Sequence, residues 1–159
     1  MDDGRWWAVS AIGGLGLLGA LIRPPVPAPL IGGDMSLRLE LFVRDLDSSV
    51  RFYTRTLGFS VERRESDYVV LVNGSCVLGI GRMADLSGSH PLRASSKERR
   101  GLGVELVLEV DDVVGYLARV QGLGIPVETG LRRRSWGATD FRILDPDGYY
   151  LRITSRTGV

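Results

Sequence analysis

The side chains of this chain that could do chemistry are mainly carboxylates and guanidinium groups. His90 is the only histidine and Cys76 the only cysteine among the 159 residues. His90 lies in a polar stretch, where we expect it to be solvated, so a Ser-His-acid triad is not indicated. One cysteine allows neither an intramolecular disulfide nor a thiolate metal cluster. Acidic and basic residues are therefore the candidates for function.

Two alternating segments carry these candidates, residues 39–46 and residues 104–112. Successive side chains of a strand point to opposite faces, so Arg38, Glu40 and Phe42 are expected to share one face. The matching face of the second segment carries Glu105, Val107 and Glu109. A carboxylate on such a face could do acid–base work, and a guanidinium could bind a carboxylate, a phosphate or a carbonyl group. The alternative is a structural network in which the charges pair with one another.

These segments begin two copies of an internal repeat. Each leads into a helical pattern that closes on a Leu-Gly pair, and the closing glycines, Gly58 and Gly124, are 66 residues apart. A repeat of this length indicates two copies of one supersecondary unit that pack together to bury a core. Turn-forming pairs at residues 73–74 and 147–148 predict further strands. Each half therefore reads β-α-β-β-β.

Acidic residues mark the start of both predicted helices. The first helix is expected to begin at the turn of residues 45–47, and the second has either Asp111 or Asp112 as its cap. Glycine is expected to end each helix, at Gly58 in the first and at Gly122 or Gly124 in the second.

The repeat predicts one domain that occupies residues 35–157. We expect module one at residues 37–82, a polar linker at 83–101 and module two at 102–155. With 44% hydrophobic residues, such a domain can bury a core without disulfides or metals. A net charge of +1 gives no electrostatic basis for nucleic-acid binding.

Residues 1–34 stand outside the repeat as an apolar, proline-rich extension. Residues 6–22 are uncharged and, as a helix, would span ~25 Å, the short edge of a membrane span. We interpret the extension as disordered, with Met35 as the authentic start and a cytoplasmic protein as the result. A membrane tether through residues 6–22 and a cleaved signal are the alternatives.

The repeat and the closing segment at residues 135–148 together resemble the vicinal oxygen chelate superfamily. The segment contains Ser135, Trp136 and Gly137, then residues 140–144, and then an Asp-Pro-Asp-Gly turn at residues 145–148. The superfamily includes glyoxalase I, extradiol dioxygenases, fosfomycin-resistance enzymes and bleomycin-resistance proteins. The resemblance implies an α+β fold of two tandem β-α-β-β-β modules, whose curved sheets enclose a cleft, commonly in a homodimer.

Metal-using members of that superfamily place His, Gln or Glu at four points, which the resemblance carries onto Arg38, Gly79, Glu105 and Arg152. Guanidinium has no free lone pair and repels a cation, so only Glu105 could ligate a metal. We therefore expect no metal, no other cofactor and no catalytic residues.

The closing segment is similar to that of bleomycin-resistance-type binding proteins, including an arginine where metal enzymes carry Glu. The resemblance implies a metal-free protein that binds or sequesters a small molecule such as a drug or antibiotic. The expected cleft residues are Arg38, Glu40, Phe42, Glu105, Val107, Trp136, Tyr150 and Arg152. Two alternatives stay open: a lyase or oxidoreductase of the same fold with a noncanonical site at Glu40 or Glu105, and a non-catalytic accessory module.

Overall fold

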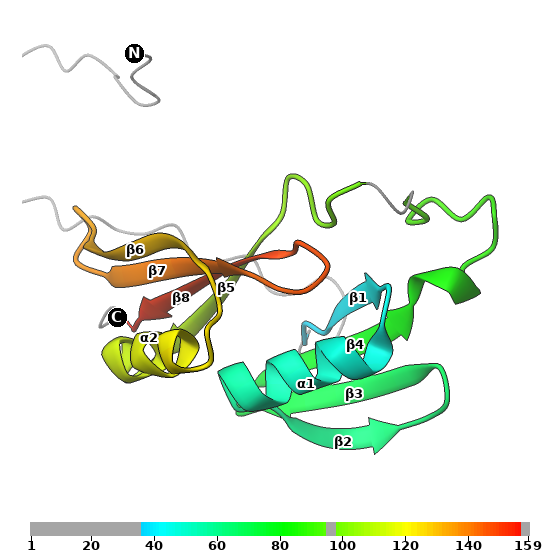
Figure 1. Cartoon of the computed structure of the whole chain (residues 1–159), viewed down its shortest axis with the longest axis horizontal. Helices are drawn as coiled ribbons and strands as arrows, with labels where there is room; N and C mark the ends of the chain where they lie inside the picture. The colour runs from blue at the N-terminus through cyan, green and yellow to red at the C-terminus, as the bar shows by residue number, and fades with distance from the viewer. Residues whose placement is uncertain (1–35, 95–97, 157–159) are drawn as a thin grey trace, which may run out of the picture. The chain divides into compact units, whose positions relative to one another are not determined.

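The computed structural model describes residues 36–94 and 98–156, which contain two β-α-β-β-β modules (Figure 1). Module one consists of β1 (Leu39–Val43), α1 (Leu46–Leu57), β2 (Ser60–Arg64), β3 (Tyr68–Asn73) and β4 (Cys76–Arg82). Module two consists of β5 (Glu105–Val110), α2 (Val113–Gly122), β6 (Val127–Arg133), β7 (Thr139–Leu144) and β8 (Tyr150–Ser155). The predicted extension at residues 1–34, with its apolar segment 6–22, lies outside the described residues.

Both helices start and stop at signals that the sequence contains. Asp45 caps α1 and Asp112 caps α2, and each capping carboxylate accepts a backbone N–H three residues further on, at 2.6 and 2.8 Å. Gly58, with φ at 72°, ends α1 in the left-handed conformation that glycine favours. The cap of α2 is therefore Asp112 rather than Asp111, and its last residue is Gly122.

Each module forms one four-stranded sheet in which the first strand lies at an edge. The strand orders are β1-β4-β3-β2 and β5-β8-β7-β6. In both sheets the first strand runs parallel to the last, and the remaining pairs are antiparallel. As a result, β1 and β5 each have one side that no strand of their own sheet occupies.

The capping residues define which positions of the two modules are equivalent. Asp45 and Asp112 are 67 residues apart, so Glu40 in β1 corresponds to Val107 in β5. Glu40 pairs with Gly79 of β4, and Val107 pairs with Arg152 of β8. Gly79 and Arg152 therefore occupy equivalent places on their sheets.

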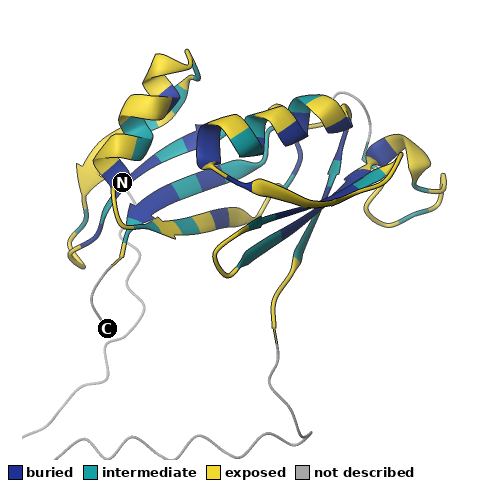
Figure 2. Ribbon diagram, turned by 90° about the horizontal axis from the view of Figure 1, so that it is seen from below, coloured by how far each residue is buried: buried dark blue, intermediate teal, exposed yellow. Residues whose placement is uncertain are grey.

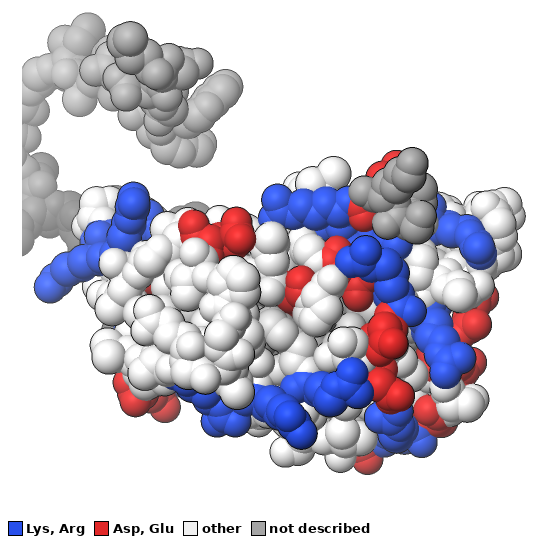
Figure 3. Space-filling view, viewed as in Figure 1, with Lys and Arg blue, Asp and Glu red and all other residues white. Residues whose placement is uncertain are grey.

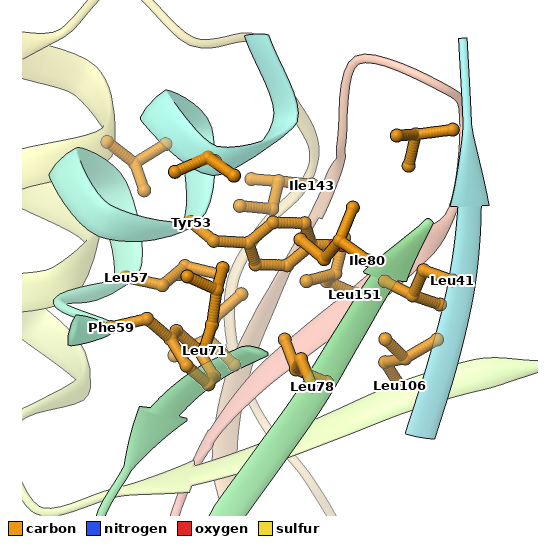
Figure 4. Close-up of a cluster of buried hydrophobic side chains, with 14 of the residues drawn as sticks. Leu41, Tyr53, Leu57, Phe59, Leu71, Leu78, Ile80, Leu106, Ile143 and Leu151 are labelled. Carbon is orange, nitrogen blue, oxygen red and sulfur yellow. The ribbon is translucent and has the colours of Figure 1, made fainter. Parts of the chain in front are cut away.

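Alternate residues of both sheets meet in one hydrophobic core beneath the helices, as Figure 2 shows by burial and Figure 4 by side chains. Tyr53 of α1 lies at its centre and is fully buried. Module one contributes Leu41, Leu57, Phe59, Leu71, Leu78 and Ile80, and module two contributes Leu106, Ile143 and Leu151. Burial of about 1.5–3 kcal/mol per large apolar side chain makes this shared core the main force that joins the modules.

The turn between β7 and β8 fastens module two to module one through two carboxylates. Asp145 accepts a hydrogen bond from the Tyr53 hydroxyl at 3.0 Å, and Asp147 accepts one from Arg44 Nε at 2.9 Å. Asp145 also accepts the backbone N–H groups of Asp147 and Tyr149, which fixes the turn. Burial raises the pKa of Asp145. The Asp-Pro-Asp-Gly motif is therefore a structural joint.

The segment that joins the modules begins with a short 3-10 helix, η1 (Met83–Asp85), in which Met83 is buried. This start of the predicted linker thus packs on module one. None of the helices within the described residues is long and apolar enough to cross a membrane.

Candidate functional site

The helix-free face of module one holds a hydrogen-bonded carboxylate. The Tyr68 hydroxyl lies 2.8 Å from both carboxylate oxygens of Glu40, and Arg38 Nε lies 2.7 Å from one of them. Burial, together with the hydrogen bond to Glu40, raises the pKa of Tyr68, so the phenol stays protonated and donates. The predicted pairing of Arg38 with Glu40 is present, and Tyr68 completes the group.

Glycines form the floor under this group. A Cβ atom at Gly79 would overlap the Glu40 carboxylate and the Tyr68 hydroxyl. At Gly81, a Cβ atom would lie 3.3 Å from the Phe42 ring, which therefore rests on the bare backbone of β4. Phe42 is half-buried on this face rather than part of the core between helix and sheet.

His90 lies beside this face, contrary to the expectation that it is solvated. Its ring centroid is 6.1 Å from that of Phe42, and the residue is half-buried. His90 Nδ1 accepts the backbone N–H of Leu92 at 3.1 Å, so Nε2 is the nitrogen that carries the proton of the neutral ring. The sequence placed His90 correctly in a polar loop but gave no sign that the loop returns to Phe42.

The helix-free face of module two is built around a buried carboxylate, Asp140. Its side chain has no exposed surface, and Arg134 binds it through two nitrogens, Nε at 2.9 Å and Nη2 at 2.6 Å. Arg142 Nη1 adds a third nitrogen at 3.0 Å. The hydrogen bond from Arg134, with the positive charge of Arg142, holds the pKa of Asp140 below its ordinary value. Asp140 is thus ionised and fixes two guanidinium groups.

Glu105 extends this group to the edge strand β5. Arg142 Nε donates to one Glu105 oxygen at 2.8 Å, whereas Arg152 Nε lies 3.5 Å from the other. Arg152 Nε is buried and makes no hydrogen bond to any part of the chain that the structure describes. Three guanidinium groups share two carboxylates, so the group carries one net positive charge.

The remaining predicted residues lie around these two groups. Val107 is 41% exposed on the module-two face, opposite Arg152. Tyr150 is half-buried in β8, and the guanidinium of Arg99 lies 5.4 Å from the centre of its ring. Trp136 is 61% exposed at the turn between β6 and β7, next to Arg134. Trp136 is therefore available to a ligand and does not pack into its own module.

One chain does not bring the two faces together through polar contacts. Within residues 36–94 and 98–156, no ion pair or side-chain hydrogen bond joins the Glu40 group to the Asp140 group. A pocket of about 610 Å³ lies elsewhere, between the β3–β4 turn and β5, and Val107 is the only predicted cleft residue in its lining. On the right of Figure 3, over module one, basic and acidic side chains lie interspersed.

The donor set does not fit a divalent metal. The four family-derived positions are occupied by Arg38, Gly79, Glu105 and Arg152. Glu105 already binds Arg142, and neither a guanidinium nor a glycine offers a ligand atom from its side chain. In the described part of the chain, no group of three His, Cys, Asp or Glu residues lies close enough to hold a metal ion.

The family model for the Glyoxalase/Bleomycin resistance protein/Dioxygenase superfamily matches residues 36–153. The chain belongs to this superfamily. The match spans both modules, and the two four-stranded sheets with their helices are the α+β fold expected from the repeat.

The chain is similar to proteins of this superfamily that are described by different functions. A bleomycin resistance protein from Klebsiella pneumoniae is 28% identical over 117 residues, which are 69% of this chain and 83% of that protein. The solved structure of TioX from Micromonospora sp. ML1 is 19% identical, with a TM-score of 0.65, and the similarity covers 77% of this chain and 100% of that chain. Lactoylglutathione lyase from Agrobacterium tumefaciens is 21% identical with a TM-score of 0.61, over 77% and 95% of the two chains. The two structures show the fold alone.

Sequence reasoning assigned none of Tyr68, Asp140 and Arg142 to the two groups, and it gave Arg134 no carboxylate partner. Asp140 and Arg142 alternate within residues 139–144, so the pattern placed both on one face of β7. An aspartate amid apolar strand residues is costly to bury without a cation, and this signal pointed to a guanidinium partner. No comparable signal exists for Tyr68, because its partner is 28 residues away.

Proposed function

We propose that the protein binds a small organic anion on the helix-free faces of its modules, without a metal ion and without transforming the ligand. The observation that carries this proposal is the guanidinium of Arg152, whose buried Nε has no hydrogen-bond partner among the described residues. The Arg152 side chain is 24% exposed and its ion pair with Glu105 is long, at 3.5 Å, so the exposed part of the guanidinium would donate to a ligand carboxylate or phosphate. The similarity to a bleomycin resistance protein supports binding of a drug-like compound.

The ligand class follows from the charges around Arg152 and from the aromatic residue at the turn beside Arg134. Two carboxylates hold three guanidinium groups, so one positive charge is left for an anion. Trp136 offers an exposed aromatic face near Arg134, which suits a planar ring. A planar aromatic carboxylate fits both features better than a strongly cationic compound does.

We further propose that two copies of the chain form each cleft. Among the described residues of one chain, no ion pair or side-chain hydrogen bond joins the Glu40 group to the Asp140 group, and each group is polar and partly exposed. Placing the module-one face of one copy against the module-two face of another, by a twofold axis, would create two equal clefts. This arrangement agrees with the homodimer that the family resemblance implies.

Ligand binding is tested with 2-naphthoate, a planar aromatic carboxylate, on protein that has been treated with a chelator. We expect 2-naphthoate to raise the melting temperature of the wild type, whereas 2-naphthylmethanol, which lacks the carboxylate, has a much smaller effect. Arg152→Ala should abolish the difference between the two compounds. Chromatography should return 2-naphthoate unchanged, and elemental analysis should find less than one metal ion per chain. A stoichiometric divalent ion, or equal shifts with both compounds, would refute the proposal.

A mixing experiment tests the two-copy cleft. Phe42→Ala removes a module-one contact and Arg152→Ala a module-two contact, and each variant alone should bind 2-naphthoate poorly. If the cleft joins two copies, unfolding and refolding the variants together gives heterodimers with one intact cleft, and about a quarter of the sites recover. If both faces of the cleft come from one chain, mixing restores nothing.

A further inference from the structure

The open side of β1 is covered by a tyrosine from module two. The Tyr149 hydroxyl donates to the Phe42 carbonyl oxygen at 3.1 Å and accepts the Phe42 backbone N–H at 3.3 Å. Two residues after Phe42, the backbone N–H of Arg44 donates to Asp147 at 3.0 Å on the same side of the chain. The Tyr149 phenol thus forms hydrogen bonds with both backbone groups of Phe42 on the side of β1 where no other strand pairs with it.

The equivalent side of β5 has no such cover. Cys76 is the counterpart of Tyr149 in module one. Tyr149 lies three residues before Arg152, and Cys76 lies three residues before the equivalent residue, Gly79. Glu109 is the counterpart of Phe42, because it lies three residues before the cap Asp112, as Phe42 lies three before Asp45. Module one therefore presents a small thiol where module two presents a phenol.

The pocket of about 610 Å³ occupies the space that this difference leaves, and we call it the edge pocket. Cys76 and residues 107–112 line it, together with Leu57, Phe59, Tyr116 and Ile153. Its volume is within the range of small-molecule sites, about 300–1,000 Å³.

The backbone of Glu109 points into the edge pocket. Val110 faces β8, since its carbonyl oxygen accepts the N–H of Arg156 at 3.3 Å. Alternate residues of a strand in a parallel pair bond to the same neighbour, so the N–H and C=O of Glu109 point away from β8. Among the described residues, no hydrogen bond reaches these two groups.

We propose that the edge pocket binds an uncharged or cationic phenol, whose hydroxyl repeats at Glu109 the two hydrogen bonds that Tyr149 makes at Phe42. Among the apolar and aromatic lining residues, Val107, Val110 and Tyr116 have exposed surface that can receive the ring. The charged residues of the lining are three acidic ones and one basic one, namely Glu109, Asp111, Asp112 and Arg156. This excess of negative charge disfavours an anionic ligand. This site is distinct from the Arg152 site and requires the opposite charge preference.

The test uses p-cresol, the side chain of tyrosine, on the full chain, with toluene as the matched compound that lacks the hydroxyl. Cys76 is the only cysteine, so its alkylation by iodoacetamide reports directly on the pocket. At ten times its Kd, p-cresol should slow alkylation by about tenfold and raise the melting temperature, because bound protein is protected and stabilised. Toluene at the same concentration should do much less.

Variants separate the edge pocket from the Arg152 site. Cys76→Tyr should fill the pocket with the chain's own phenol and remove the effect of p-cresol on the melting temperature, whereas Cys76→Ser should keep it. Arg152→Ala should leave both p-cresol effects unchanged. Equal protection by toluene, no protection by p-cresol, or protection that grows with protein concentration alone would overturn the proposal. These readouts of wild-type protein decide the matter even if Cys76→Tyr fails to fold.

Discussion

The two modules share one backbone plan but place opposite chemistry at equivalent positions. In the first sheet, one row of paired residues runs Glu40, Gly79 and Val70. The equivalent row of the second sheet runs Val107, Arg152 and Arg142. In the first row the acidic residue lies over a glycine, whereas in the second row a valine is followed by two arginines.

This difference shows how a duplicated unit can hold two halves of one binding site. In module one the carboxylate is saturated, because Tyr68 and Arg38 both bind Glu40. In module two the cations exceed the anions, and Arg152 is the member with the weakest contact to the protein. In the cleft that we propose, the first face would therefore shape the site and the second would supply the charge that selects the ligand.

The largest expected effect comes from breaking the centre of the module-two group with Asp140→Asn. The Asp140 side chain is fully buried between Arg134 and Arg142, so neutralising it leaves Arg134 without its carboxylate and Arg142 with Glu105 alone. We expect the free energy of unfolding to fall by about 3–5 kcal/mol. Urea unfolding followed by circular dichroism measures it.

Glu40→Gln is the matched control in module one. The Glu40 side chain is 34% exposed and its partner Arg38 is 54% exposed, so water screens the pair. Its loss should cost about 0–1 kcal/mol. Equal losses for the two variants would contradict the contrast between a buried and a solvated group.

The pH dependence of stability sharpens the same contrast. The pKa of Asp140 is lowered in the folded state by Arg134, so its contribution is present above the pKa of the unfolded chain, about 3.9, and is lost as the pH falls through the folded value. Burial raises the pKa of Asp145, which works in the opposite sense, but Asp145 is present in both proteins. The stability difference between wild type and Asp140→Asn should therefore shrink toward zero as the pH falls from ~7 to ~2. A constant difference over this range would show that Asp140 is not stabilised as an anion.

The fold could be predicted from local signals because those signals are repeated. The caps Asp45 and Asp112, the closing Gly58 and the turn at residues 73–74 all appear where the sequence indicated them. Each depends on residues within a few positions of one another, which is the range over which a sequence pattern is informative.

The partners within the candidate site could not be predicted in the same way. Glu105 was expected to pair with Arg152 or Arg38, yet its short contact is with Arg142, 37 residues away. Which guanidinium reaches a carboxylate depends on the register of β7 against β8, and alternation gives the face of a residue but not its neighbour. The contact of His90 with Phe42 depends on the path of the linker, for which the sequence has no periodic signal.

An intermediate effect is expected for Gly79→Ala, which makes module one more like module two. The added Cβ would overlap the Glu40 carboxylate and the Tyr68 hydroxyl, so their hydrogen bond must shift. We expect a loss of about 1–3 kcal/mol in urea unfolding. Gly122→Ala is the control, since nothing lies within 4 Å of its Cβ position at the end of α2, and it should be neutral or slightly stabilising. An unchanged Gly79→Ala protein would mean that the Glu40 group is not held as tightly as its contacts indicate.

The smallest effect on stability, and the most informative one on binding, is expected for Trp136→Ala. Because Trp136 is 61% exposed at the β6–β7 turn, its loss should change the free energy of unfolding by less than about 0.5 kcal/mol. The same change should weaken 2-naphthoate by about 1–3 kcal/mol if the indole stacks on the ligand beside Arg152, as isothermal titration would show. Phe42→Ala is the comparison, because that half-buried ring rests on Gly81 and should lower stability as well as binding. If Trp136→Ala binds 2-naphthoate as tightly as the wild type, the anion site of module two extends away from the β6–β7 turn, and Tyr150 is then the aromatic residue left to stack on the ligand.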